Sequence, residues 1–88
     1  MFEFDPAKSA ANKAKHGIDF VDAQALWQDD AWAEAKSKAN VAGEVRFLAV
    51  GRIEGKHWTA ICTLRGEAVR IISVRRAREE EIGHYEGT

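Results

Sequence analysis

The chain has 88 residues, of which 45% are hydrophobic and 31% charged, and its formal net charge is −1. This composition excludes a disordered tail and predicts one small folded domain over residues 1–88. The only cysteine, Cys62, excludes a disulfide framework within the chain, and its apolar surroundings are typical of a buried thiol in a reducing compartment. The sequence has no basic and apolar leader and no membrane-length apolar run, so we expect a cytoplasmic protein without membrane contact.

Two helices are predicted in the first third of the chain. The pair Asp5-Pro6 marks a helix start, because aspartate caps free N–H groups and proline at the first helical position loses no hydrogen bond. Residues 7–15 are rich in alanine and lysine and favour helix, and Gly17 ends it. A second helix follows over residues 19–28, with an aspartate as its cap and an apolar stripe along one side.

Beyond residue 30 the apolar period changes from helical to alternating. The predicted elements are a weak edge strand (31–37), a loop (38–44), three strands (45–53, 57–64 and 69–76) and a terminal helix (77–86). The tight turns between the long strands require antiparallel neighbours. The sequence therefore predicts an α+β fold with two N-terminal helices, a three- to four-stranded antiparallel sheet and a short C-terminal helix.

Side-chain alternation within these strands predicts where the arginines point. Arg46 and Arg52 are expected on one face of the first long strand. In the last strand, Arg70 and Arg76 are expected on one face and Arg75 on the other. Adjacent residues of a strand point in opposite directions, so Arg75 and Arg76 cannot both lie on one face of the sheet.

Charge is distributed unevenly along the chain. Residues 1–43 carry five Lys against seven Asp or Glu, and residues 44–78 carry seven Arg and one Lys against three Glu. Residues 79–88 carry four Glu and neither Lys nor Arg. The planar guanidinium of arginine suits phosphate, so the central segment is a candidate phosphate-binding region. The alternative is an ordinary solvated charged surface.

Three segments, in order along residues 2–86, carry a resemblance to a known family. The opening segment is Phe2-Glu-Phe4-Asp5-x-x-Lys8-x-x-x-Asn12-x-x-Lys15-His16-Gly17-Ile18. The middle and closing segments are Glu44-Val-Arg46-Phe47 with Gly51, and Arg70-Ile-Ile-Ser73-Val-Arg75-Arg76-Ala77 with Tyr85. Together they resemble the BrnT toxins, which are similar in fold to the RelE-type ribonuclease toxins. The acidic run at residues 79–81 departs from the basic residues expected at this place.

The resemblance implies the toxin of a type II toxin–antitoxin system, an endoribonuclease that cleaves cellular RNA and inhibits growth. It also implies neutralisation by a cognate antitoxin with a ribbon-helix-helix domain, typically in a heterotetramer that binds operator DNA only through the antitoxin. The alternative is a catalytically inactive binding subunit that acts only in antitoxin binding and operator autoregulation.

RNA cleavage without a metal requires a base for the 2′-OH, an acid for the leaving 5′-oxygen and fixed cations for the phosphorane charge. His16 is the best acid/base candidate, because imidazole titrates near neutral pH. The alternative is that His16 only caps carbonyl groups at the end of its helix. The spacing of the remaining histidines and of Cys62 forms no metal site, so we expect neither a metal nor another cofactor.

Arg75 and Arg76 are the candidates for phosphate binding and transition-state stabilisation, and Arg46 and Arg65 are secondary members of this set. The alternative for these arginines is a network of ion pairs with Glu44, Glu67 and the glutamates at 79–81. Three further residues are candidates for RNA binding: Lys8, Lys15 and Tyr85. The two lysines lie seven residues apart on one helix face, and the tyrosine could stack on a base, with core packing as its alternative.

Overall fold

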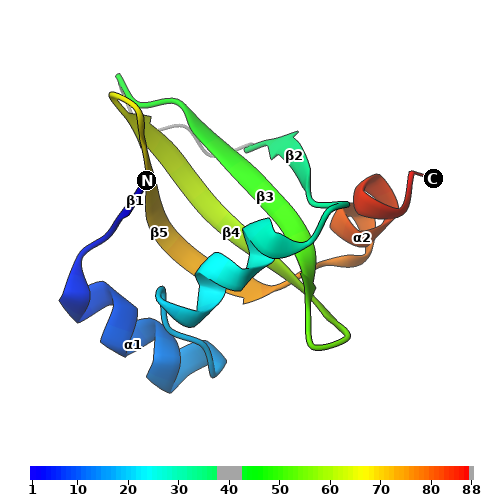
Figure 1. Ribbon diagram of the computed structural model, residues 1–88, viewed down its shortest axis with the longest axis horizontal. Coiled ribbons are helices and arrows are strands. Elements are labelled where there is room, and N and C mark those ends of the chain that lie inside the picture. Colours follow the sequence, from blue (N-terminus) through cyan, green and yellow to red (C-terminus); the bar gives the residue numbers. More distant parts are fainter. Residues whose placement is uncertain (38–42, 88) are drawn as a thin grey trace.

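A five-stranded sheet forms the centre of the fold (Figure 1). The computed structural model describes residues 1–37 and 43–87. In chain order the elements are β1 (Phe2–Glu3), α1 (Pro6–His16), the 3₁₀ helix η1 (Asp22–Gln28), β2 (Ala33–Lys36), β3 (Arg46–Ile53), β4 (Lys56–Arg65), β5 (Ala68–Arg76) and α2 (Glu79–Glu86). The strand order is β1-β5-β4-β3-β2. Of the predicted loop at 38–44, residues 38–42 lie outside the described residues.

The prediction of a three- to four-stranded antiparallel sheet was wrong, although the fold is α+β. The sheet has a fifth strand, β1, which pairs parallel to β5 with Phe2 opposite Val69 and Glu3 opposite Arg70. β1 has only two residues, which is too short to show an alternating pattern. No hairpin turn marks a parallel pairing, and α1 is part of the long crossover that such a pairing requires.

The N-terminal helix begins and ends where the sequence predicts. The carboxylate of Asp5 accepts the N–H of Ala7 at 2.9 Å, and Gly17 adopts the left-handed conformation with a φ of 85°. The second helix is shorter than predicted and is a 3₁₀ helix, entered through the Asp19 carboxylate, which accepts the N–H of Asp22 at 2.8 Å.

The helix η1 crosses β3 in direct contact at Gly51. A Cβ atom on Gly51 would lie 3.1 Å from both the Cγ atom and the carbonyl oxygen of Leu26. Any side chain at this position would push η1 away from the sheet, because the carbonyl belongs to the backbone. Glycine in the middle of β3 is therefore explained by the close approach of the helix rather than by a turn.

The core lies on the sheet face that η1 covers. Its buried members are Ile18, Phe20, Ala23, Leu26, Ala49, Ala60, Cys62, Ile71 and Val74. Burial raises the pKa of the Cys62 thiol to about 12, so the cysteine behaves as a small apolar core residue.

Two buried polar side chains attach α1 to this core. The Asn12 amide donates to the carbonyl oxygens of Ile18 at 2.8 Å and Val74 at 2.9 Å, and its oxygen accepts the N–H of Val74 at 3.1 Å. Asn12 thus replaces a neighbouring strand along the edge of β5 that the short β1 leaves uncovered. The hydroxyl of Ser9 accepts the N–H of Phe20 at 2.9 Å.

A β-bulge in β5 changes the predicted directions of its arginines. Ile61 pairs with Ser73 but Cys62 pairs with Ile71, so Ile72 is an extra residue in β5. The bulge reverses the side-chain alternation along β5. Arg70 pairs with Thr63 and Arg75 pairs with Thr59, so the two arginines lie on the same face of the sheet. The prediction that Arg70 and Arg76 share a face was therefore wrong. The prediction that Arg75 and Arg76 point to opposite faces is confirmed.

Candidate functional site

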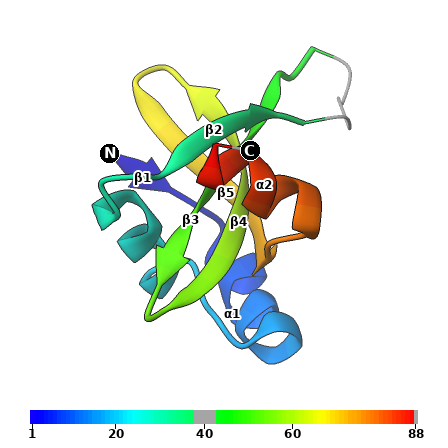
Figure 2. The same cartoon turned by 90° about the vertical axis from the view of Figure 1, so that its right-hand side faces the viewer.

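A groove lies between α2 and the sheet face opposite the core. Figure 2 shows α2 in front of the sheet beside β2, and α2 packs against both β2 and β3. The groove has a volume of about 510 Å³. Its lining residues are Ala35, Lys36, Ser37, Arg46, Leu48, Ile61, Ile72, Ser73, Arg75, Arg78, Glu80, Glu81 and His84. It therefore combines an aliphatic floor with a rim that carries several cationic groups.

Polar contacts hold α2 over this groove. The Nε2 atom of His84 lies 2.8 Å from the carbonyl oxygen of Glu34 in β2. Because a carbonyl can only accept, this nitrogen carries the hydrogen of the bond. The Tyr85 hydroxyl donates to the Asp29 carboxylate at 2.6 Å. This hydrogen bond is the main cause that lowers the pKa of Asp29 and raises the pKa of Tyr85.

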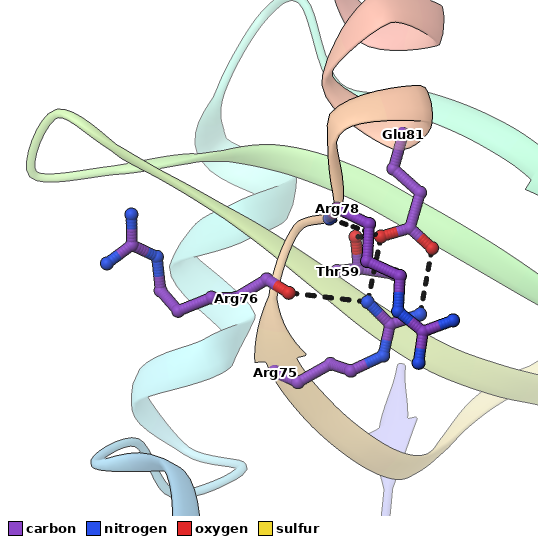
Figure 3. Close-up of polar contacts among 5 residues, drawn as sticks. All are labelled: Thr59, Arg75, Arg76, Arg78 and Glu81. Carbon is purple, nitrogen blue, oxygen red and sulfur yellow. Dashed lines mark hydrogen bonds and ion pairs between the residues drawn. The ribbon is translucent and has the colours of Figure 1, made fainter.

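Arg75 and Glu81 form a bidentate ion pair at one wall of the groove (Figure 3). The Nη1 and Nη2 atoms of Arg75 donate to Oε1 and Oε2 of Glu81, each at 2.8 Å. Glu81 is only 7% exposed, and it also accepts from the Thr59 hydroxyl at 3.0 Å and the Arg78 N–H at 2.8 Å. Burial alone would raise the pKa of Glu81, but the hydrogen bonds from Arg75, Arg78 and Thr59 outweigh it and hold the pKa at about 2.

The other two arginines of the groove are less constrained. Arg46 pairs with Glu44 at 3.3 Å, and both side chains remain partly exposed. The Arg78 guanidinium forms no ion pair with a carboxylate within residues 1–37 and 43–87. The groove thus brings together Arg46 from the start of β3, Arg75 from the end of β5, and Arg78 from the residue before α2.

Arg76 lies on the opposite side of the sheet from Arg75, and Figure 3 shows the two side chains pointing apart. Its guanidinium carbon lies 5.5 Å from the centre of the Trp58 ring, and its Nε atom donates to the carbonyl of His57 at 3.2 Å. This is a cation–π contact on the core face. Arg76 is not among the residues that line the groove.

The remaining predicted site residues are also outside the groove lining. His16 is half-buried at the end of α1, and Lys8 and Lys15 are exposed on the same helix. Arg65, at the end of β4, lines a separate cavity with Glu44, Val45 and Phe47 among others. Tyr85 bonds to Asp29, and its ring meets the His57 ring edge-on at 5.3 Å. Of the predicted residues, the structure brings together only Arg46 and Arg75 in the groove.

Sequence reasoning missed three residues of this site: Arg78, Glu81 and His84. A signal for two of them was present, because Glu81, His84 and Tyr85 have the spacing that places side chains on one helix face. Arg78 directly precedes the helix, where a side chain can point back toward the sheet. Three adjacent glutamates at 79–81 indicate a charged segment, and nothing in this local pattern shows that Glu81 is buried.

Neither a metal cluster nor a membrane helix is found in the described part of the chain. No group of three or more His, Cys, Asp or Glu side chains within residues 1–37 and 43–87 could hold a metal ion. None of the helices in these two ranges is long and apolar enough to cross a membrane.

Comparison with known proteins gives one match to a family. Residues 4–81 match the family described as "Ribonuclease toxin, BrnT, of type II toxin-antitoxin system". No curated protein matches the chain. The matched region includes the groove residues Arg46, Arg75, Arg78 and Glu81, and it ends before His84 and Tyr85.

Proposed function

We propose, from the premise that the chain belongs to the BrnT family of ribonuclease toxins of type II toxin–antitoxin systems, that it cleaves RNA in the groove between α2 and the sheet. One observation carries this proposal: Arg46, Arg75 and Arg78 come from three places in the chain and line one groove together with His84. Guanidinium groups bind phosphate well, and imidazole is the side chain best suited to proton transfer near neutral pH.

The chemistry we propose is an attack of the RNA 2′-oxygen on the adjacent phosphorus. A base removes the 2′-OH proton, the bond from phosphorus to the 5′-oxygen breaks, and an acid protonates that oxygen. The products are a 2′,3′-cyclic phosphate and a 5′-OH end. The arginines stabilise the added negative charge on phosphorus, which is the role that a metal ion would otherwise fill. We therefore propose metal-independent cleavage, with His84 as one proton-transfer group.

The predicted residues outside the groove receive a different role in this proposal. An RNA chain is much longer than the groove, so its backbone extends beyond it on both sides. We propose that His16, Arg65 and Arg76, with the RNA-binding candidates Lys8, Lys15 and Tyr85, contact these flanking parts. Such contacts raise affinity with little effect on the chemical step.

A type II system also supplies an antitoxin partner. We propose that this partner is a ribbon-helix-helix protein, that it neutralises the toxin in a heterotetramer, and that operator DNA is bound only through it. We further propose that the free toxin acts in the cytoplasm and inhibits growth by cleaving cellular RNA. Co-expression with the neighbouring reading frame tests this part, and a growth defect that this frame does not relieve contradicts it.

The cleavage proposal is tested with purified protein and a mixed-sequence RNA transcript in excess EDTA. We expect cleavage by the wild type and a loss of about 100-fold in kcat for Arg46→Gln and for His84→Ala, the scale of a lost electrostatic or acid–base contribution. Arg52→Gln is the matched control, because Arg52 lies on the same strand as Arg46 but outside the groove. Cleavage that requires a divalent metal, or an equal loss in the control, contradicts the proposal.

One observation favours the alternative of an inactive binding subunit. Arg75, the least exposed of the ion-paired arginines, already has a carboxylate partner in Glu81. If this pair blocks phosphate binding, the protein expressed without its antitoxin is harmless and leaves cellular RNA intact. Growth arrest with RNA degradation in the same experiment excludes the alternative.

A further inference from the structure

The Glu81 carboxylate is more heavily bonded than a surface glutamate. Its two oxygens accept four hydrogen bonds, two from Arg75 and one each from the Thr59 hydroxyl and the Arg78 backbone. Thr59 is fully buried in β4, and Arg78 is the residue at which α2 begins. The carboxylate is thus fixed both by β4 and by the start of its own helix, and a carboxylate fixed in this way also fixes the guanidinium that it binds.

The geometry of Arg75 shows which part of its guanidinium is occupied. Both Nη atoms donate to Glu81, and Nη1 also donates to the carbonyl oxygen of Arg76 at 3.3 Å. Three of the five N–H groups of an arginine are then used. The other two, on Nε and Nη2, point from the same edge of the planar group, and neither has an acceptor within residues 1–37 and 43–87.

The unoccupied edge of the Arg75 guanidinium can bind a phosphate group through two hydrogen bonds. Two parallel N–H groups on one edge match two oxygens of a phosphate, which is the strongest arrangement that an arginine offers. Arg75 lines the groove. An arginine without a fixed partner must lose rotamer freedom when it binds a ligand, and holding it beforehand removes this cost from the binding step.

We infer that Glu81 is a positioning residue, which holds one edge of Arg75 so that the other edge binds the phosphate of RNA in the groove. The inference rests on the proposed ribonuclease function. It gives the acidic residue a role opposite to the one its charge suggests. If Glu81 only repelled RNA, its removal would improve binding and cleavage. If it positions Arg75, its removal impairs the chemical step.

Neutralising Glu81 separates these two outcomes. Glu81→Gln keeps the shape of the side chain and removes its charge. The matched control is Glu79→Gln, which makes the same charge change at an exposed position in the same helical turn. On a mixed-sequence RNA transcript we expect Glu81→Gln to lower kcat about tenfold and to change KM less than threefold, and Glu79→Gln to leave both unchanged. In an Arg75→Ala background, Glu81→Gln should have no further effect. Equal or faster cleavage by Glu81→Gln overturns the inference.

A second measurement on the wild type does not depend on the folding of a variant or on activity. The Nε–H resonance of Arg75 is followed by NMR while inorganic phosphate is added. We expect a saturable shift of this resonance, and its absence in the folded wild type overturns the inference. Failure of the wild type to cleave RNA overturns the proposed function instead. The phosphate titration then still decides whether the Arg75 edge binds phosphate.

Discussion

The two faces of the sheet are held to their helices by different forces. On the core face, Phe20 and Leu26 are fully buried, and the amide of Asn12 satisfies backbone groups of β5 and of the segment after α1. On the groove face, the only buried residue of α2 is Glu81, and its contacts are an ion pair and hydrogen bonds. Apolar burial stabilises the first face, and its side chains offer few groups that could bind a ligand or react with it. The second keeps guanidinium and imidazole groups at a groove, where they can act on a ligand.

The largest expected effect of a single substitution is on the core face. Phe20 is 1% exposed and packs edge-on against Phe4 with ring centres 5.7 Å apart. Phe20→Ala should lower the free energy of unfolding by about 4 kcal/mol, through lost burial and the cavity that remains. Val21→Ala is the control, because Val21 is 61% exposed and its truncation should cost less than about 0.5 kcal/mol. Urea denaturation measures both, and equal losses would show that the core is not where the structure places it.

The next effect tests a polar group on the same face. Asn12→Ala leaves the N–H and C=O of Val74 and the C=O of Ile18 without their partner, so we expect a loss of about 3 kcal/mol in unfolding free energy. The exposed Lys13, changed to Ala, is the control on the same helix. A loss below about 1 kcal/mol for Asn12→Ala would mean that water replaces the amide at the β5 edge.

Much of the core face could be predicted from the sequence. The cap at Asp5, the stop at Gly17 and the antiparallel strands depend on neighbours in the chain, and local chemistry is sufficient to predict them. The strand β1 and the bulge at Ile72 could not be predicted, because each depends on which distant segment lies beside it.

The groove was harder to predict for the same reason. The sequence identified Arg75 and Arg76, with Arg46 and Arg65 as secondary members, as phosphate-binding candidates by residue type. Side-chain alternation correctly separated Arg75 from Arg76, but it could not show which of the two faces carries the groove. Which carboxylate meets Arg75 depends on how α2 folds back over the sheet, and no local pattern contains that information.

A third effect concerns the groove face and depends on pH. The pKa of Glu81 is lowered from 4.5 to about 2 in the folded protein. A lowered folded-state pKa contributes stability above the unfolded-state value, and this contribution is lost as the pH falls from about 4.5 toward 2. Between pH 7 and pH 3 we expect this group to account for a loss of about 2 kcal/mol in unfolding free energy.

The comparison of variants isolates this contribution from other acidic groups. Glu81→Gln should have a lower unfolding free energy than the wild type at pH 7, and the difference should shrink toward pH 3. Glu79→Gln, with its exposed side chain, should follow the wild-type pH profile. Parallel profiles for the wild type and Glu81→Gln would contradict the buried ion pair as the main attachment of α2.

The smallest expected effect separates two adjacent arginines. Arg76→Gln removes a cation–π contact with Trp58, and such a contact contributes about 0.5–1 kcal/mol at an exposed site. Because Arg76 lies on the core side of the sheet, we expect RNA cleavage to fall less than about threefold. This loss should come from weaker binding of the RNA backbone and so from a higher KM. Arg75→Gln should lower kcat about 100-fold, because it removes a cation from the groove. Cleavage assays on the two variants at equal protein stability measure the difference. Equal losses in kcat would mean that RNA crosses the end of β5 and contacts both faces of the sheet in the chemical step. The division between a stabilising face and a reactive face would then be wrong.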